Sequence, residues 1–191
     1  MPAFHPIVVL PPGYAVLDLS GGWPKPPDTP WTVGRYDEDR GVYTQPLFGG
    51  TRTVHVGIDL GGPAGVAVHA FAPGEVVLAG ETPAPGDYGP TLVTEHTLDG
   101  RPLYVLLGHL SRASLLQSPV GRRFSASDVL GWLGEPHENG GWPPHVHVQL
   151  ARDRPATHDL PGVVTREDRA PALARFPDGL TTSGALGSRI A

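Results

Sequence analysis

The sequence predicts an all-β fold, and two observations carry this prediction. From Thr51 onward, short β-branched runs alternate with turn signals, a pattern typical of sheet proteins. The 191 residues include 26 Gly and 23 Pro, which are poor in helix interiors, so long helices are not expected. The length suits one domain, with or without appendages, that can bury its own core.

The elements follow in order along the chain. Residues 1–50 are interrupted by Pro or Gly every few positions, so we expect an irregular N-terminal extension packed on the core. Residues 51–150 are expected to form the β domain. Its predicted strands are 54–59, 66–70, 75–79, 91–96, 103–107, 129–133 and 145–150.

The connections between these strands also carry signals. Pro-Gly-Glu at 73–75 and Leu-Asp-Gly-Arg at 98–101 are both typical of hairpin turns. The stretches 82–90 and 134–144 are loops by composition, and only 110–117 permits a helix within the β region. Residues 151–191 are expected to form an appendage with small pieces at 159–163 and 166–175 and a disordered end.

Charge and termini exclude several classes of protein. The net charge is −5 and no run of Lys or Arg occurs, which argues against a nucleic-acid partner. The apolar N-terminal run stops at Leu10, too short for a signal peptide or a membrane span. The chain therefore reads as cytoplasmic, although a secreted chain whose signal had been replaced by Met would look the same. Cys is absent, so any metal must be held by His, Asp or Glu.

The motif His145-Val-His147 carries the first chemical signal. Alternate residues of a strand share a face, so both imidazoles point the same way, about 6.6 Å apart along the strand. Two imidazoles cannot both be buried cheaply without partners. Either this face is a solvated polar row, or it holds a metal or an acid.

A second signal is His55-Val-Gly-Ile-Asp59. A helix is unfavourable there because Gly57 lies inside it, and on a straight strand the two side chains would be about 13 Å apart. They can share a metal only if the strand ends or bends at Gly57. Zinc accepts His and carboxylate ligands, and catalytic zinc sites keep one position open. The remaining His of the pair and His109 could move protons or stabilise an oxyanion.

At these positions the sequence resembles the lysostaphin/LytM-type zinc metallopeptidases, which cleave peptide cross-links of bacterial cell walls. The resemblance covers about residues 51–150 and rests on three ordered motifs: HVGID at 55–59, YVLLGHL at 104–110 and HVH at 145–147. It implies the duplicated hybrid motif fold: a compact antiparallel β-sheet of the split-barrel kind, with a groove, long loops and irregular terminal extensions.

The resemblance also implies roles for single residues. One Zn²⁺ per chain would be held by His55, Asp59 and His147, with His109 and His145 as the catalytic pair. The substrate would be a peptide or a peptidoglycan stem peptide. Because every motif position is filled, a catalytically dead relative is not favoured. Asn139 is the only Asn, so the latent form in which an N-terminal Asn blocks the zinc is not expected.

The sequence departs from usual family members in its missing export signal and its longer loops. These features look like a subgroup found beside aminotransferase or kinase-like partner domains in larger cytoplasmic proteins. Because of these features, two alternative functions stay open: a non-catalytic zinc-containing binding or regulatory module, and a hydrolase of a small cytoplasmic peptide or amide. A sugar-phosphotransfer carrier with paired His and no metal is a third class, which the HxxxD pair disfavours.

Residues outside the motifs have expected roles that follow from their place in a loop or a strand. Trp142, Tyr88 and His137 lie in the two long loops and are expected to contact substrate. His96 ends a strand and is expected to orient a metal ligand from behind. The charge run at 33–40 is interpreted as a solvated face.

Overall fold

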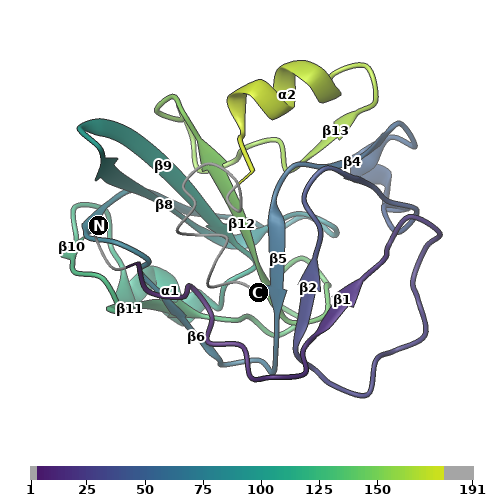
Figure 1. The fold of residues 1–191 in the computed structure, drawn as a ribbon, viewed down its shortest axis with the longest axis horizontal. Helices are drawn as coiled ribbons and strands as arrows, with labels where there is room; N and C mark the ends of the chain where they lie inside the picture. The colour runs from purple at the N-terminus through teal and green to yellow at the C-terminus, as the bar shows by residue number, and fades with distance from the viewer. Residues whose placement is uncertain (1–3, 179–191) are drawn as a thin grey trace.

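The structure, a computed structural model, describes residues 4–178 and is built mainly of strands (Figure 1). Within these residues the largest sheet has eight strands, in the order β1-β2-β5-β12-β9-β8-β7-β10. The strands of this sheet are β1 (Ala15–Leu17), β2 (Thr32–Gly34), β5 (Ile58–Gly61), β7 (Gly74–Thr82), β8 (Gly89–Leu98), β9 (Arg101–Gly108), β10 (Arg123–Phe124) and β12 (His145–Ala151). The all-β prediction is confirmed.

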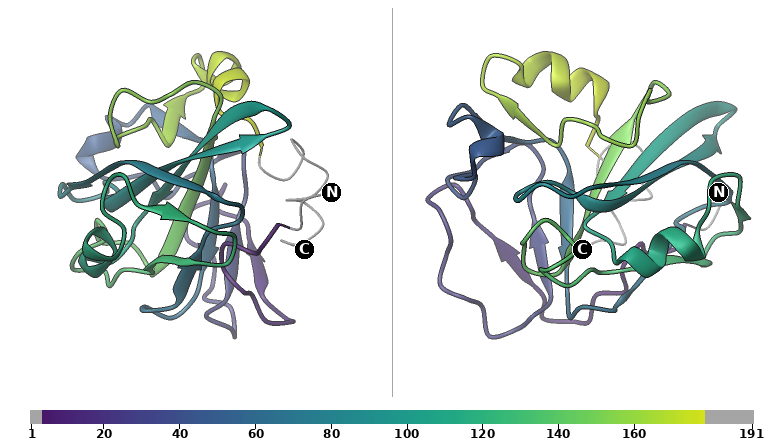
Figure 2. Two further views of the ribbon diagram at one scale, coloured as in Figure 1. Left: turned by 90° about the vertical axis from the view of Figure 1, so that its left-hand side faces the viewer. Right: turned by 180° about the vertical axis from the view of Figure 1, so that it is seen from behind.

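Two smaller sheets complete the described part of the chain. One joins β6 (Ala67–His69) to β11 (Val129–Trp132), and the other has the order β13-β4-β3. The strands of the second are β3 (Glu38–Asp39), β4 (Arg52–His55) and β13 (Val163–Thr165). The short helices α1 (Arg112–Gln117) and α2 (Arg169–Arg175) pack beside β11 and β13, on opposite sides of the molecule (Figure 2). No helix of residues 4–178 is long and apolar enough to span a membrane.

The large sheet is open and mixed, whereas a purely antiparallel split barrel was expected. The difference lies at β1, which runs parallel to β2, while the other neighbours pair antiparallel. Parallel neighbours need a connection of about a dozen residues or more, and residues 18–31 provide it.

The central strands are buried on both faces, which places the core. On β8 and β9, Leu92 and Leu107 belong to one apolar cluster, while Val93 and Leu106 belong to the other. This alternation follows from the period of two along a strand. The motif HVHVQL lies on β12, which pairs with β9, so it is attached to strands that are covered on both faces.

One predicted hairpin is confirmed and the other is wrong. Leu98 pairs with Arg101 across Asp99 and Gly100, which both have positive φ, as a two-residue primed turn requires. By contrast, β6 and β7 do not pair with each other. Gly74 has no turn conformation, and a Cβ there would lie 2.4 Å from the Glu95 carbonyl oxygen. It is needed for the close approach of β7 to β8.

The N-terminal extension is more regular than predicted. It contributes β1 and β2 to the large sheet, β3 to the sheet of β4, and the 3₁₀ turn η1 (Pro46–Phe48). Likewise β13 of the C-terminal part pairs with β4. These short strands satisfy the edge backbone groups of β5 and β4, a demand that local composition does not reveal. The predicted disordered end, beyond residue 178, lies outside the described residues.

Candidate metal centre

The predicted strand over residues 54–59 ends between the two halves of its motif. β4 ends at His55, β5 begins at Ile58, and the two belong to different sheets. A Cβ at the intervening Gly57 would lie 2.3 Å from Cε1 of His147, so only glycine leaves room for that ring. The break expected from Gly57 is therefore present, and it lets one short motif reach a single point from two sheets.

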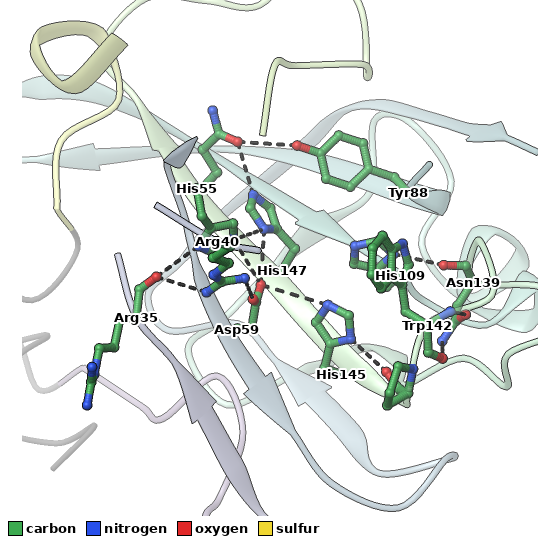
Figure 3. Close-up of polar contacts among 12 residues, drawn as sticks. Arg35, Arg40, His55, Asp59, Tyr88, His109, Asn139, Trp142, His145 and His147 are labelled. Carbon is green, nitrogen blue, oxygen red and sulfur yellow. Dashed lines mark hydrogen bonds and ion pairs between the residues drawn. The ribbon is translucent and has the colours of Figure 1, made fainter. Parts of the chain in front are cut away.

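Three buried side chains converge at this point: His55 from β4, Asp59 from β5 and His147 from β12 (Figure 3). Asp59 and His147 are direct partners in the antiparallel register of β5 and β12. His55 Nε2 lies 2.9 Å from His147 Nδ1 and 3.2 Å from Asp59 Oδ1, and His147 Nδ1 lies 3.1 Å from the same oxygen.

The outer hydrogen bonds set the tautomer of each imidazole. His55 Nδ1 donates to the Arg35 carbonyl at 2.9 Å, and His147 Nε2 donates to Gln149 Oε1 at 3.1 Å. Each ring therefore presents a lone pair toward Asp59 Oδ1. Three acceptors facing one another at this range repel unless a cation lies among them.

The triangle formed by these three atoms, His55 Nε2, Asp59 Oδ1 and His147 Nδ1, also has the size that zinc requires. Zinc binds His and carboxylate ligands at about 2.0–2.1 Å in a tetrahedron, whose edge is then roughly 3.3–3.4 Å. The observed sides of 2.9, 3.1 and 3.2 Å are close to this value. The residues present fit a zinc ion with three protein ligands.

Arg40 holds the other oxygen of the Asp59 carboxylate. Its Nη1 donates to Asp59 Oδ2 at 2.7 Å, and its Nε donates to Glu38 at 2.8 Å. Its Nη2 donates to the carbonyl of Arg35, the same oxygen that receives His55 Nδ1. Arg40 is only 3% exposed, so the solvated charge run expected at 33–40 is wrong for this residue.

This surrounding keeps Asp59 ionised. Burial would raise the pKa of its carboxyl, but attraction by His55 and Arg40 outweighs burial and holds the pKa well below its usual range. Burial, reinforced by repulsion from Arg40, lowers the pKa of His55 to about 4. At neutral pH Asp59 is thus a carboxylate and His55 a neutral imidazole, the protonation states in which these groups bind a metal.

His109 and His145 lie beside the cluster with their rings 4.4 Å apart. His109 Nδ1 donates to the Asn139 carbonyl at 2.8 Å, and His145 Nδ1 donates to the Pro143 carbonyl at 2.7 Å. Both Nε2 atoms are therefore free to accept a proton, and that of His145 is 3.8 Å from Asp59 Oδ1. Burial lowers the pKa of both rings.

Backbone geometry marks His109 as a constrained position. Its φ is +62°, a left-handed conformation that few residues other than glycine adopt. Hydrogen bonds on both sides of the residue hold it there, from its own N–H to Tyr88 and from Gly134 N–H to its carbonyl. Strain of this kind persists where the surroundings over-determine it.

A cavity of about 180 Å³ opens onto all five of these motif residues. Tyr88 and Trp142, two of the residues expected to contact substrate, line this cavity. The ring centroid of Tyr88 lies 5.4 Å from that of His109 and 5.3 Å from that of His147. His137, on the same loop as Trp142, is exposed and does not line the cavity.

His96 lies elsewhere and does not orient a ligand. Its ring nitrogens are used by Thr94 Oγ1 at 2.9 Å and the Pro73 carbonyl at 3.0 Å. The orienting contacts come instead from Arg35, Arg40 and Gln149. Gln149 had a local signal, since it continues the alternation of His145 and His147 on one face of β12.

The two long loops meet over this cavity. Gly86 N–H donates to the Gly140 carbonyl at 2.8 Å, which joins the loop at 82–90 to the loop at 134–144. Within the second loop the buried Asn139 side chain bonds to Gly134, Gly141 and Trp142. The carbonyl of the same residue orients His109, so the loop supports the site directly.

A His/Asp/His cluster beside two neutral, oriented imidazoles on an all-β fold is compatible with a zinc metallopeptidase centre. The model of peptidase family M23 matches residues 53–158, and the chain belongs to this zinc-dependent family. The expected resemblance to lysostaphin/LytM-type peptidases is thereby confirmed.

A solved structure agrees with the fold, and a second is reported beside it. A mutant of the catalytic domain of the prophage-encoded M23 protein EnpA from Enterococcus faecalis is 23% identical; the match covers 69% of this chain and 88% of that one, with a TM-score of 0.50. The catalytic domain of the antimicrobial peptidase lysostaphin from Staphylococcus simulans is 20% identical, over 60% and 77% of the two chains, with a TM-score of 0.44. A search of curated proteins finds no match.

Proposed function

We propose that the chain is a zinc-dependent metallopeptidase of the lysostaphin/LytM type that hydrolyses peptide bonds of the kind found in cell-wall cross-links. The observation that supports this most directly is the convergence of three lone pairs, from His55, Asp59 and His147, on one point beside two neutral imidazoles. When bound, zinc supplies a Lewis acid that activates water and polarises the scissile carbonyl.

In this proposal His109 and His145 move the protons. Their Nε2 atoms carry no proton at neutral pH, so either can take the proton of the attacking water. Once protonated, each becomes a donor that can stabilise the tetrahedral oxyanion or pass its proton to the leaving amine. The Asn139 and Pro143 carbonyls hold both rings in the tautomer that this requires.

A short peptide or amide is a second substrate class, because walls from residues 17–48 and 159–163 enclose the cavity. Turnover of cell-wall fragments and of short peptides by the same preparation separates the two classes. A chain that binds zinc but turns over neither would be the non-catalytic module.

The metal and the catalytic pair are tested together. Elemental analysis should find about one zinc per chain, and His55→Ala should lose it. His109→Ala should keep the zinc while turnover falls by about 10²-fold or more. The exposed His137→Ala, from the same loop as Asn139, is the matched control and should change neither. A folded wild type without zinc, or an unimpaired His109→Ala, contradicts the proposal.

A further inference from the structure

The cavity continues beyond the metal centre into an aromatic chamber. Trp142 is its hub, with ring centroids of Tyr43, Phe48 and Trp23 at 6.0, 6.3 and 6.3 Å. The ring of His109 lies 6.3 Å from Trp142 on the other side, so the chamber borders the catalytic pair. A group seated among these rings is adjacent to the reacting centre.

Most of this wall lies outside the part of the chain that matches the family model. The matched residues 53–158 hold the metal-binding motifs, whereas Trp23, Tyr43 and Phe48 come from the N-terminal extension. Further apolar lining comes from Leu17, Leu19, Val42, Leu47, Leu160 and Val163. The chamber is thus an addition that this chain makes to the family core.

The side chains that line the interior of the chamber offer no unpaired charge to a guest, and the buried Trp142 Nε1–H is a neutral donor without a hydrogen-bond partner. Arg40 is already paired with Glu38 and Asp59, and it also donates to the Tyr43 hydroxyl at 3.0 Å. The remaining charged lining residues, Arg52, Asp87 and Asp159, are partly or fully exposed at the rim. A charged side chain in the chamber would therefore lose its hydration without gaining an ion pair.

The mouth of the chamber also carries exposed apolar side chains beside these charged residues. Trp23 is 57% exposed and Leu47 is 37% exposed, both at the lining of the cavity. The Arg52 guanidinium donates to the Leu47 carbonyl, which ties η1 to β4. The apolar interior, together with these exposed apolar side chains at the rim, favours a guest that brings apolar surface out of water.

On these grounds, and resting on the proposed peptidase function, we infer that the peptide substrate carries a bulky uncharged apolar side chain, aromatic or leucine-like, next to the cleaved bond. A glycine-only cross-link presents no side chain and would leave the chamber unfilled. Lys or Glu at this position would place a charge in the apolar chamber and is disfavoured. Burial of a side chain of this size should favour the Phe peptide by about tenfold or more over Gly.

The test uses one series of end-blocked pentapeptides, Gly-Gly-X-Gly-Gly, with X as Phe, Leu, Gly, Lys or Glu. Hydrolysis by the zinc-loaded wild type is followed by chromatography and expressed as kcat/KM. Binding without turnover is measured by tryptophan fluorescence on His109→Ala, with His145→Ala as a second inactive variant. We expect Phe and Leu to exceed Gly, Lys and Glu about tenfold in both readouts.

Variants of the wall assign the preference to the chamber. Phe48→Ala and the rim variant Leu47→Asn should reduce the Phe-to-Gly ratio severalfold. Leu116→Ala is the matched control, because Leu116 is 87% exposed on α1 away from the cavity, and its ratio should equal that of the wild type. Leu47→Asn lies at the surface, so it tests the chamber even if Phe48→Ala fails to fold.

The outcomes separate this inference from the proposed function. Hydrolysis with no preference, or with a preference for Gly, Lys or Glu, overturns the substrate class and leaves the peptidase standing. A tenfold binding preference without hydrolysis of any peptide supports the chamber and counts against the peptidase. Equal binding of all five peptides overturns the inference whatever the turnover.

Discussion

The two oxygens of Asp59 have different partners, and this division organises the metal centre. Oδ1 faces the lone pairs of His55 and His147, while Oδ2 is held by Arg40 at 2.7 Å. The carboxylate therefore presents one oxygen to the metal position. Residues that orient a metal ligand in this way commonly contribute 10–100-fold to metal affinity.

Replacing Arg40 should consequently weaken zinc binding without touching a ligand. We expect Arg40→Met to raise the Kd for zinc by about 10–100-fold, measured by competition with a chromophoric chelator. Arg40→Lys, which retains one charge and loses the fork of donors, should recover part of the affinity. Arg169→Met removes an exposed ion pair with Asp37 and serves as the control. Unchanged affinity in Arg40→Met would show that Asp59 needs no such support.

His96 predicts a pH dependence that is separate from the metal centre. Burial lowers its pKa to about 4, below the value of about 6.5 expected in the unfolded chain. The unfolded state therefore binds more protons between these two values. The contribution of His96 to the free energy of unfolding is therefore fully present above pH 6.5. It should be lost as the pH falls toward 4, with a slope of up to about 1.4 kcal/mol per pH unit.

The measurement is urea unfolding across pH 4–7 for wild type and His96→Gln. Gln retains a donor and an acceptor for Thr94 and the Pro73 carbonyl, so the variant should fold. Its stability should fall less steeply with decreasing pH than that of the wild type. Parallel curves would mean that His96 does not titrate in this window.

At the scale of elements, the loop at 134–144 acts as a small scaffold built around Asn139. The Asn139 side chain accepts from the N–H groups of Gly141 and Trp142 and donates to two carbonyls. Its own carbonyl receives His109 Nδ1. Loop shape and imidazole orientation are therefore coupled through one residue.

Removal of that side chain should be costly and selective. Asn139→Ala leaves several buried backbone groups without partners, so we expect about 2–4 kcal/mol of lost stability in urea unfolding. Zinc content should stay near one per chain, because none of the three ligands lies on this loop, while turnover falls. The exposed neighbour His137→Ala controls for loop substitution. Loss of zinc together with turnover would contradict the separation between loop and metal ligands.

The elements also show what local sequence can and cannot predict. Period-two alternation in HVHVQL is a local property, so the common face of His145 and His147 was predictable, and the glycine between His55 and Asp59 allowed the strand break. The role of Arg40 was not predictable, because it depends on long-range hydrogen bonds to Asp59 and to the Arg35 carbonyl. The local charge pattern around Arg40 is typical of a solvated face. The hairpin turn predicted from Pro-Gly-Glu at 73–75 was wrong, because a glycine can be required by the close approach of two strands as well as by a turn.

For the whole molecule, fold class and the order of the motifs could be predicted, while the terminal segments could not. β1, β2 and β13 are only three residues long and lie next to segments rich in Pro and Gly. They become strands because they pair with strands elsewhere that need partners. We expected irregular segments packed on the core, and this expectation missed that the segments supply walls of the cavity. Long-range pairing leaves little trace in composition.

The metal should stabilise the molecule as a whole. Three facing acceptors repel without a cation, and any ligand that binds only the folded state adds stability by mass action, about 4 kcal/mol at a thousandfold excess over its Kd. We expect a chelator to lower the thermal midpoint of the wild type and readdition of Zn²⁺ to restore it. The thermal midpoint of His55→Ala should lie near that of the wild type in chelator, and neither chelator nor added Zn²⁺ should change it. A wild-type midpoint that ignores both would mean that the cluster holds no metal.

The pairing of β4 with β13 sets the order in which this molecule can be completed during synthesis. Val54 emerges from the ribosome early, but its neighbour Val164 follows near the end of the described chain, and His147 also comes long after His55 and Asp59. A nascent chain therefore carries two of the three ligands with neither the third nor the cavity wall at 159–163. Such long-range closure is slow compared with local folding. The three-residue cluster and its cavity wall therefore stay incomplete until the chain as far as Val164 is available to fold.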